Sequence, residues 1–360
     1  MKNKRSPYID ILKAIGIISI VVGHGTNGNV PLPFSIVSFV YTYHLMIFFF
    51  TAGFCFKSSD AATPFAFIGK RLKGILPLYV IYNLIFTFLH NVFVYMNVLP
   101  NLTLYTPGSF LYSFFNSFTL STAETMLGAF WFLPVLLFAE LFFVLIFHFA
   151  EKLGHHGKYL HLLAFCSSAI VGIILNHEGY YLSYHMQTSV LALPVMYVGY
   201  CLKNHIDTVK KYCTWWGGLI SAAIIVLILN KTLLFIELSV NSIMSPLLFY
   251  PVTFLGLYFC MSLAALIEKN SFTQNLFSYI GKNSFHIMAL HFICFKIIDF
   301  VYYHAVGFSE PSILQQFPSS FPIWPVYYLG GTFLPLGIVW LFYKVRNTIK
   351  GNLFMIQVKK

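Results

Sequence analysis

A lysine and a histidine lie eleven positions apart in the first apolar stretch of the chain, YIDILKAIGIISIVVGH, which covers residues 8–24. At about 100° per residue this separation is close to three helical turns, so Lys13 and His24 leave a helix on nearly one face, about 16 Å apart along its axis. An imidazole suits a general base, and a lysine suits an anionic partner. With Asp10, the helix has three ionisable groups, which in an apolar segment indicate a functional site.

Simpler interpretations of these three residues exist. Lys13 could extend to lipid phosphates, His24 could lie at a membrane interface, and the segment could be a secretory signal. The signal is disfavoured because the small-residue cleavage pattern is absent and nine further apolar runs follow. Asp10 is expected to orient Lys13 or Arg5, which lie three and five positions away.

The composition indicates the elements that position these residues. Of 360 residues, 58% are hydrophobic and only 9% are charged, too few to cover the surface of a soluble domain of this length. The sequence therefore predicts an all-α, polytopic transmembrane bundle. About ten apolar runs could cross the roughly 30 Å of hydrocarbon in a bilayer. They cover approximately residues 9–25, 37–56, 74–97, 129–150, 159–175, 189–202, 215–235, 244–267, 284–304 and 324–343.

The distribution of basic residues predicts an orientation. The N-terminus and every second connecting segment carry Lys or Arg, whereas the other loops contain only Lys231. By the positive-inside rule both termini are cytoplasmic, which an even number of spans also requires. Lys13 would then lie near the inner boundary and His24 near the outer one. We expect one membrane domain over residues 1–350, a cytoplasmic tail over residues 351–360, and outer segments 98–128 and 305–323 that fold back onto the membrane.

Charge and cysteine content exclude several classes of site. The basic residues behind the net charge of +11 lie mainly at the termini and in alternate connecting segments, where they orient a membrane protein, so we expect no nucleic-acid partner. The six cysteines show no CxxC spacing, and the histidines are scattered without companions at ligand spacing. We therefore expect neither a disulfide framework nor a bound metal.

Four further stretches follow the first run in order: YHLMIFFFTAGFCFK (43–57), KRLKGILPLYV (70–80), FWFLPVLLFAEL (130–141) and YIGKNSFHIMALHFICFK (279–296). Together with Arg5, Asp10 and the Lys13 to His24 spacing, they resemble the acyltransferase-3 family of integral membrane acyltransferases. In that family a basic residue, ten intervening positions and a histidine occur at this place. The first residue is usually Arg, and Lys keeps the charge but loses the planar geometry with which Arg binds phosphate.

The resemblance implies a function. Members of the family move acyl groups from cytoplasmic acyl-CoA to hydroxyls of carbohydrates on bacterial surfaces or to their lipid-linked precursors. It implies acetyl-CoA as the donor substrate, with no permanently bound cofactor, a carbohydrate acceptor, and a location in the bacterial cytoplasmic membrane. His24 is expected to act as the general base. Lys70, Arg71 and Lys73, helped by Arg5, are expected to bind the CoA phosphates, unless these charges only orient the protein.

Three further residues are weaker candidates. His44 directly precedes a stretch that resembles the family and is expected to contribute to catalysis. Glu140, near the middle of a span, is costly if unpaired, so a basic partner is expected, either in a structural ion pair or in a substrate-binding site. His291 could contact the acceptor or could be a satisfied histidine of the core.

Transport is the main alternative function. A transporter or flippase of a lipid-linked sugar or small anion also needs ionisable residues within a bundle, but it predicts corresponding Gly- or Pro-broken spans in two halves of the chain. The sequence shows no such pairing. Release of CoA that depends on His24 would distinguish the enzyme from a transporter.

Overall fold

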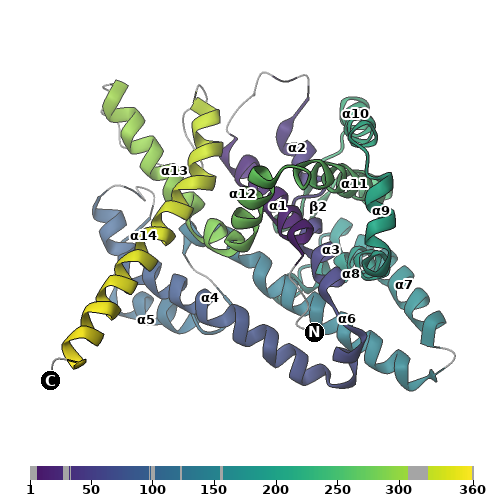
Figure 1. The fold of residues 1–360 in the computed structure, drawn as a ribbon, viewed down its shortest axis with the longest axis horizontal. Coiled ribbons are helices and arrows are strands. Elements are labelled where there is room, and N and C mark those ends of the chain that lie inside the picture. Colours follow the sequence, from purple (N-terminus) through teal and green to yellow (C-terminus); the bar gives the residue numbers. More distant parts are fainter. Residues whose placement is uncertain are drawn as a thin grey trace.

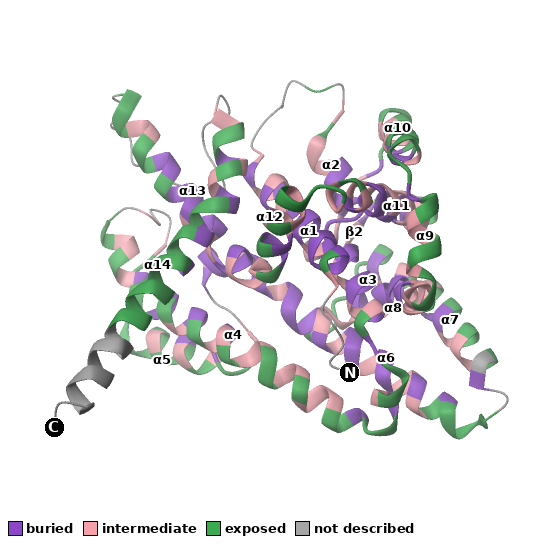
Figure 2. Cartoon of the chain, in the orientation of Figure 1, coloured by how far each residue is buried: buried purple, intermediate pink, exposed green. Residues whose placement is uncertain are grey.

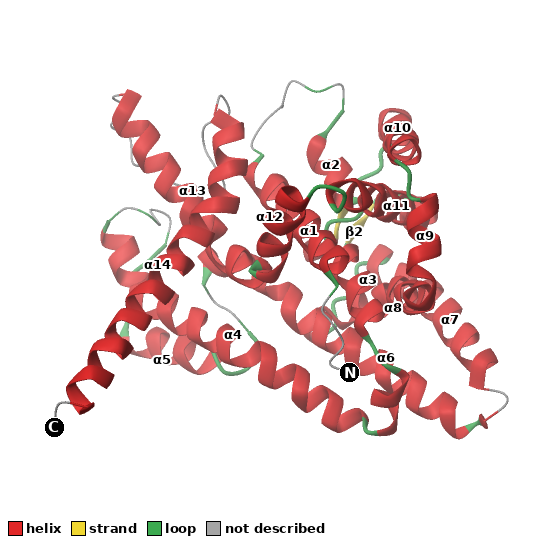
Figure 3. Cartoon of the chain, viewed as in Figure 1, coloured by secondary structure: helices red, strands yellow, loops and turns green. Residues whose placement is uncertain are grey.

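In the computed structural model, helices occupy all ten of the predicted apolar runs (Figures 1 and 3). The structure describes residues 6–26, 32, 34–96, 98, 102–121, 124–154, 157–306 and 323–358. The α-helices are α1 Pro7–Gly25, α2 Ile36–Tyr41, α3 Met46–Cys55, α4 Pro64–Tyr95, α5 Pro107–Asn116, α6 Phe132–Lys152, α7 Gly157–His177, α8 Met186–Leu202, α9 Ile206–Tyr212, α10 Trp215–Lys231, α11 Phe249–Ile267, α12 Ser271–Lys282, α13 Ser284–Val306 and α14 Trp324–Val358.

The predicted helical membrane bundle is confirmed, with a smaller number of spans. In the described part of the chain, eight helical segments are long and apolar enough to cross a membrane. The segment 183–212 and α10 meet at a bend of 95° and raise the number to nine at most. Helices α8 and α10 have 17 residues each, and at about 1.5 Å per residue neither reaches across about 30 Å of hydrocarbon alone. The orientation of the termini stays a prediction.

Helix α1 lies inside the bundle, where it packs against α3, α11, α12, α13 and α14 (Figure 1). In the apolar window of α1, 78% of the residues are buried, against 22% in α7. Figure 2 shows the same contrast between the buried centre and the exposed helices α7, α10 and α14. The exposed side chains of those outer helices include many large apolar residues, as lipid contact requires.

A short amphipathic helix that the sequence analysis did not predict holds one end of α1. Helix α12 begins after Asn270, whose side chain accepts hydrogen bonds from the backbone amides of Phe272 and Thr273, a common N-terminal cap. A Cβ atom at Gly281 would collide with the backbone carbonyl of Asp10. Glycine thus allows α12 to pack directly on the turn of α1 that precedes Lys13.

Part of the predicted outer segment 98–128 folds back on α4. Glu124 accepts hydrogen bonds from the Tyr105 hydroxyl at 3.0 Å and lies 3.2 Å from Nδ1 of His90. The rings of His90 and Tyr105 stack with centroids 3.6 Å apart. Burial, with a contribution from Glu124, raises the pKa of Tyr105 to about 12. The phenol therefore stays protonated and donates its hydrogen bond to the Glu124 carboxylate. Most of the second predicted outer segment, 305–323, lies outside the described residues.

Three interruptions of regular structure lie close to His24. The span from Ile36 to Cys55 is broken by a turn at Thr42–Leu45. The 3-10 helix η2, Thr125–Trp131, precedes α6 and is kinked at Leu127. Between α10 and α11, the strands β1 Ile236–Glu237 and β2 Ser242–Ile243 pair antiparallel around the 3-10 helix η6, Leu238–Val240. Irregular backbone at membrane depth is tolerated where it is buried or lines a cavity.

Candidate active site

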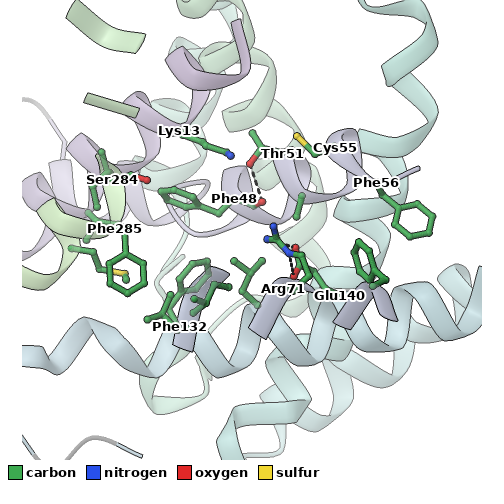
Figure 4. Close-up of a pocket in the computed structure, with 18 residues that line it drawn as sticks. Lys13, Phe48, Thr51, Cys55, Phe56, Arg71, Phe132, Glu140, Ser284 and Phe285 are labelled. Atoms are coloured by element: carbon green, nitrogen blue, oxygen red, sulfur yellow. Dashed lines mark hydrogen bonds and ion pairs between the residues drawn. The ribbon is translucent and has the colours of Figure 1, made fainter. Parts of the chain in front are cut away.

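One cavity is lined by regular helices. We call it the lysine cavity; its volume is about 320 Å³. Lys13 enters it from α1, Arg71 from α4 and Glu140 from α6, and Figure 4 shows the Lys13 amine directed toward Thr51 of α3. The remaining walls are mostly apolar, formed by Ile17, Ile20, Phe48, Ala52, Cys55, Phe56, Phe67, Ile75, Phe132, Leu133, Leu136, Ser284, Phe285 and Met288.

Glu140 has the basic partner that the sequence predicted. The Arg71 guanidinium donates to both carboxylate oxygens, from Nε at 2.7 Å and from Nη2 at 2.6 Å (Figure 4). The Glu140 side chain is 4% exposed, whereas that of Arg71 is 39% exposed. The two-pronged pair neutralises a carboxylate in the bundle and leaves one side of the guanidinium accessible to the cavity.

The second cavity is lined largely by the irregular elements. We call it the histidine cavity; its volume is about 280 Å³. His24 enters from α1, His44 from the turn between α2 and α3, Trp131 from η2, and Glu237 from β1. The other lining residues are Ile20, Tyr41, Leu45, Gly128, Ala129, Phe132, Ser239, Met288 and Phe292.

His24 is hydrogen-bonded to His291, and the geometry indicates which nitrogen carries each proton. Nδ1 of His24 lies 2.9 Å from Nε2 of His291. Nδ1 of His291 faces the backbone carbonyls of Ile287 and Met288 at 3.1 and 2.9 Å. Because carbonyls only accept, His291 carries its proton on Nδ1, and in the neutral ring Nε2 is an acceptor. His24 therefore donates from Nδ1, and its lone pair is on Nε2.

Aromatic rings fix the orientation of both histidines that line the cavity. The His24 ring stacks on Phe292 with centroids 4.9 Å apart, and on His291 at 5.2 Å. His44 stacks on Tyr41 at 4.4 Å. Stacked rings restrict rotation about the side-chain bonds, so the imidazoles are held in place before any substrate arrives.

The two cavities share Ile20, Phe132 and Met288 as wall residues. Lys13 lines one of the cavities and His24 the other, the arrangement that their helical spacing predicts. Helix α1 therefore presents a cation and an imidazole to two adjoining spaces within the bundle.

Other residues predicted from the sequence lie elsewhere. Lys70 and Lys73 are exposed on α4 and line neither cavity. Asp10 is buried and lines a separate cavity of about 280 Å³, together with Lys282. Arg5 lies outside the described residues. His291 is fully buried behind His24 and is not a lining residue.

Sequence reasoning missed Trp131, Glu237 and Ser239 as lining residues. Trp131 belongs to the stretch 130–141 that resembles the family, but that resemblance predicts no lining role for it. Glu237 is an acidic residue in a loop with few charges, and this isolation is the sequence feature that could have indicated a site residue. No group of three or more metal-ligating side chains occurs within the part of the chain that the structure describes.

Comparison with known proteins identifies the class of the chain. A family model described as an acyltransferase domain, that of acyltransferase 3, matches residues 6–344. The match therefore includes both cavities. No curated protein and no solved structure shows a significant match.

Proposed function

Because the chain belongs to the acyltransferase 3 family, we propose that it transfers an acyl group, most simply acetyl, from acyl-CoA to a hydroxyl of a cell-surface carbohydrate or its lipid-linked precursor. One observation carries the proposal: a cavity with a cationic wall and a cavity with an imidazole adjoin across three shared residues. Such a pair of spaces matches a donor with an anionic end and a neutral acceptor that must lose a proton.

The lysine cavity is the proposed path for the donor. Its volume of about 320 Å³ suits an extended, largely apolar chain such as the pantetheine arm, while the nucleotide stays outside. Lys13 and the exposed side of the Arg71 guanidinium are the cations available to the phosphates or to the thioester carbonyl. The positive-inside prediction would place the nucleotide on the cytoplasmic side.

The histidine cavity is the proposed place of transfer. Nε2 of His24 takes the proton of the acceptor hydroxyl as its oxygen attacks the thioester carbon. The tetrahedral intermediate then collapses, the C–S bond breaks, and His24 returns the proton to the departing CoA thiolate. The products are an ester and CoA thiol, and no other reactant is needed. His291 holds Nδ1 of His24 protonated, so that the lone pair stays on Nε2.

A native cysteine provides a test of the donor path. Cys55 is exposed and lines the lysine cavity, whereas Cys201 is exposed and lines neither cavity. In purified C166S/C201S protein, acetyl-CoA should slow the reaction of Cys55 with a maleimide, by roughly tenfold at ten times its Kd. The matched C55S/C166S protein reports on Cys201, whose labelling should not change.

The same preparations test the chemistry. Carbohydrate acceptors should accelerate CoA release, and H24A should lower that release at least about a hundredfold while it keeps the protection of Cys55. Equal labelling of Cys55 with and without acetyl-CoA would reject the donor path. Carbohydrate uptake without consumption of acetyl-CoA would instead support a transporter.

A further inference from the structure

The β1–η6–β2 hairpin brings the acidic residue Glu237 into the histidine cavity. Its Oε1 atom accepts hydrogen bonds from the backbone amide of Ser239 at 3.1 Å and from the Ser239 hydroxyl at 2.7 Å. Tyr41 lines the same cavity as this carboxylate. A carboxylate has about four acceptor sites, so Glu237 keeps capacity for a further donor in the cavity.

Contacts from two other segments, the loop after α7 and the first turn of α8, hold the hairpin in place. Asn241, in the left-handed region at φ 54°, accepts a hydrogen bond from Gln187 at 2.8 Å and donates one to the carbonyl of Tyr180 at 2.8 Å. The Tyr181 hydroxyl donates to the carbonyl of Ser239 at 2.7 Å. Side chains on such a fixed support keep their position when a ligand binds.

The charged side chain that lines the histidine cavity is negative and has no cationic counterpart among the described lining residues. Among the described residues that line it, Glu237 is the one carboxylate, and none is Lys or Arg. The indole of Trp131 and the phenol of Tyr41 line the same space, and such rings can pack against the face of a sugar. An acceptor with a carboxylate beside the reacting hydroxyl would meet a like charge with no cation to offset it.

We propose that Glu237 selects the acceptor by charge: the histidine cavity takes a neutral or amino sugar ring whose hydroxyl or ammonium group donates to the carboxylate, and it rejects a uronate. The inference rests on the proposed acyl transfer and names the acceptor class for it. Glu237 binds the acceptor, whereas His24 takes its proton.

The test uses purified full-length protein, acetyl-CoA and three methyl glycosides, of glucose, glucosamine and glucuronate. Wild type should show kcat/KM at least about tenfold higher for the first two acceptors than for the glucuronide. In E237Q the amide oxygen still accepts from Ser239, so the hairpin is preserved. This variant should lose about tenfold in kcat/KM for the neutral acceptor, through KM, and prefer it over the glucuronide by less than threefold.

Two controls separate this inference from the proposed function. E178Q makes the same change of charge at an exposed residue after α7 and should leave acceptor preference unchanged. Protection of Cys55 by acetyl-CoA should be equal in E237Q and wild type. The inference is overturned if E237Q keeps the wild-type preference, or if acetyl-CoA is hydrolysed in a His24-dependent manner but no ring accepts the acyl group. Absence of any His24-dependent CoA release would count against the acyl transfer itself.

Discussion

The lysine cavity and the histidine cavity share three wall residues but are constructed differently. The walls of the lysine cavity come almost entirely from regular helices, namely α1, α3, α4, α6 and α13. The histidine cavity is lined by the break at Thr42–Leu45, by η2 and by the β1–η6–β2 hairpin, in addition to α1, α2, α6 and α13. Regular helices satisfy their own backbone polar groups, so the lysine cavity offers mainly apolar side chains, together with Lys13 and the Arg71–Glu140 ion pair.

This difference indicates how the bundle separates binding from chemistry. A long, apolar path suits a flexible chain that needs few specific contacts, whereas proton transfer requires polar groups at fixed positions. Interrupted helices bring such groups together from distant parts of the sequence. His24 and His291, for example, are 267 positions apart and 2.9 Å from each other. If the division is correct, variants of each cavity should affect different kinetic constants.

The largest effect is expected for H24A. A general base contributes about 10²- to 10⁴-fold to the rate, so kcat for acyl transfer should fall within that range while acetyl-CoA still protects Cys55. Transfer is measured as acceptor-dependent CoA release from matched amounts of purified protein. Activity above about a third of wild type, far more than this range allows, would exclude His24 as the base.

Replacement of His291 should lower kcat by about ten- to hundredfold, a smaller effect than the roughly 10⁴-fold loss known for a buried carboxylate that orients a catalytic histidine. H291L removes the acceptor for Nδ1 of His24 and frees the other tautomer. H291Q supplies a side-chain oxygen and should recover part of the activity. KM for acetyl-CoA should change in neither variant. Equal losses in both variants would indicate that His291 serves only packing.

The fold was largely predictable from the sequence, because hydrophobicity and length report directly on membrane helices. The ionic partner of Glu140 was expected on the same grounds, since an unpaired carboxylate is costly there. Lys13 and Arg71, which line the lysine cavity, could be predicted as site residues because both are basic residues near the ends of long apolar helices. Helix α12 was missed, although Asn270 and the amphipathic pattern that follows it are a recognisable signal.

The histidine cavity was less predictable for a physical reason. Glu237 reaches it from a strand of two residues, too short to show any alternation of polar and apolar residues. Its position depends on hydrogen bonds that join Asn241 to Gln187 of α8 and to Tyr180 of the loop after α7, which are far from Glu237 in the sequence. Likewise, the register of α13 against α1, which pairs His291 with His24, is fixed by packing and not by the period of either helix.

Lys13 should affect the donor side, with a loss of about tenfold or more in kcat/KM for acetyl-CoA on removal of its charge. K13M keeps a long apolar stem, so we expect it to be expressed and inserted yet largely inactive. K13R should retain or improve activity, because the guanidinium binds a phosphate or a carbonyl at least as well. The control K211M changes an exposed lysine outside both cavities. Comparable activity of K13M and wild type would show that the spacing to His24 is accidental.

The smallest effect is expected for Lys70 and Lys73, which are exposed on α4. Arg71 stays intact in this experiment because its loss would leave the buried Glu140 carboxylate unpaired. Exposed charges act through a screened field, so K70Q/K73Q should raise KM for acetyl-CoA only about two- to fivefold at low salt, with no difference from wild type at about 1 M salt. KM for the acceptor should not change. K211Q/K269Q, also exposed, is the matched control for net charge. A reporter fused to the C-terminus measures membrane topology in parallel. If K70Q/K73Q inserts in the inverted orientation and KM for acetyl-CoA is unchanged, these lysines serve to orient the protein in the membrane. Donor binding would then depend on Lys13 and Arg71.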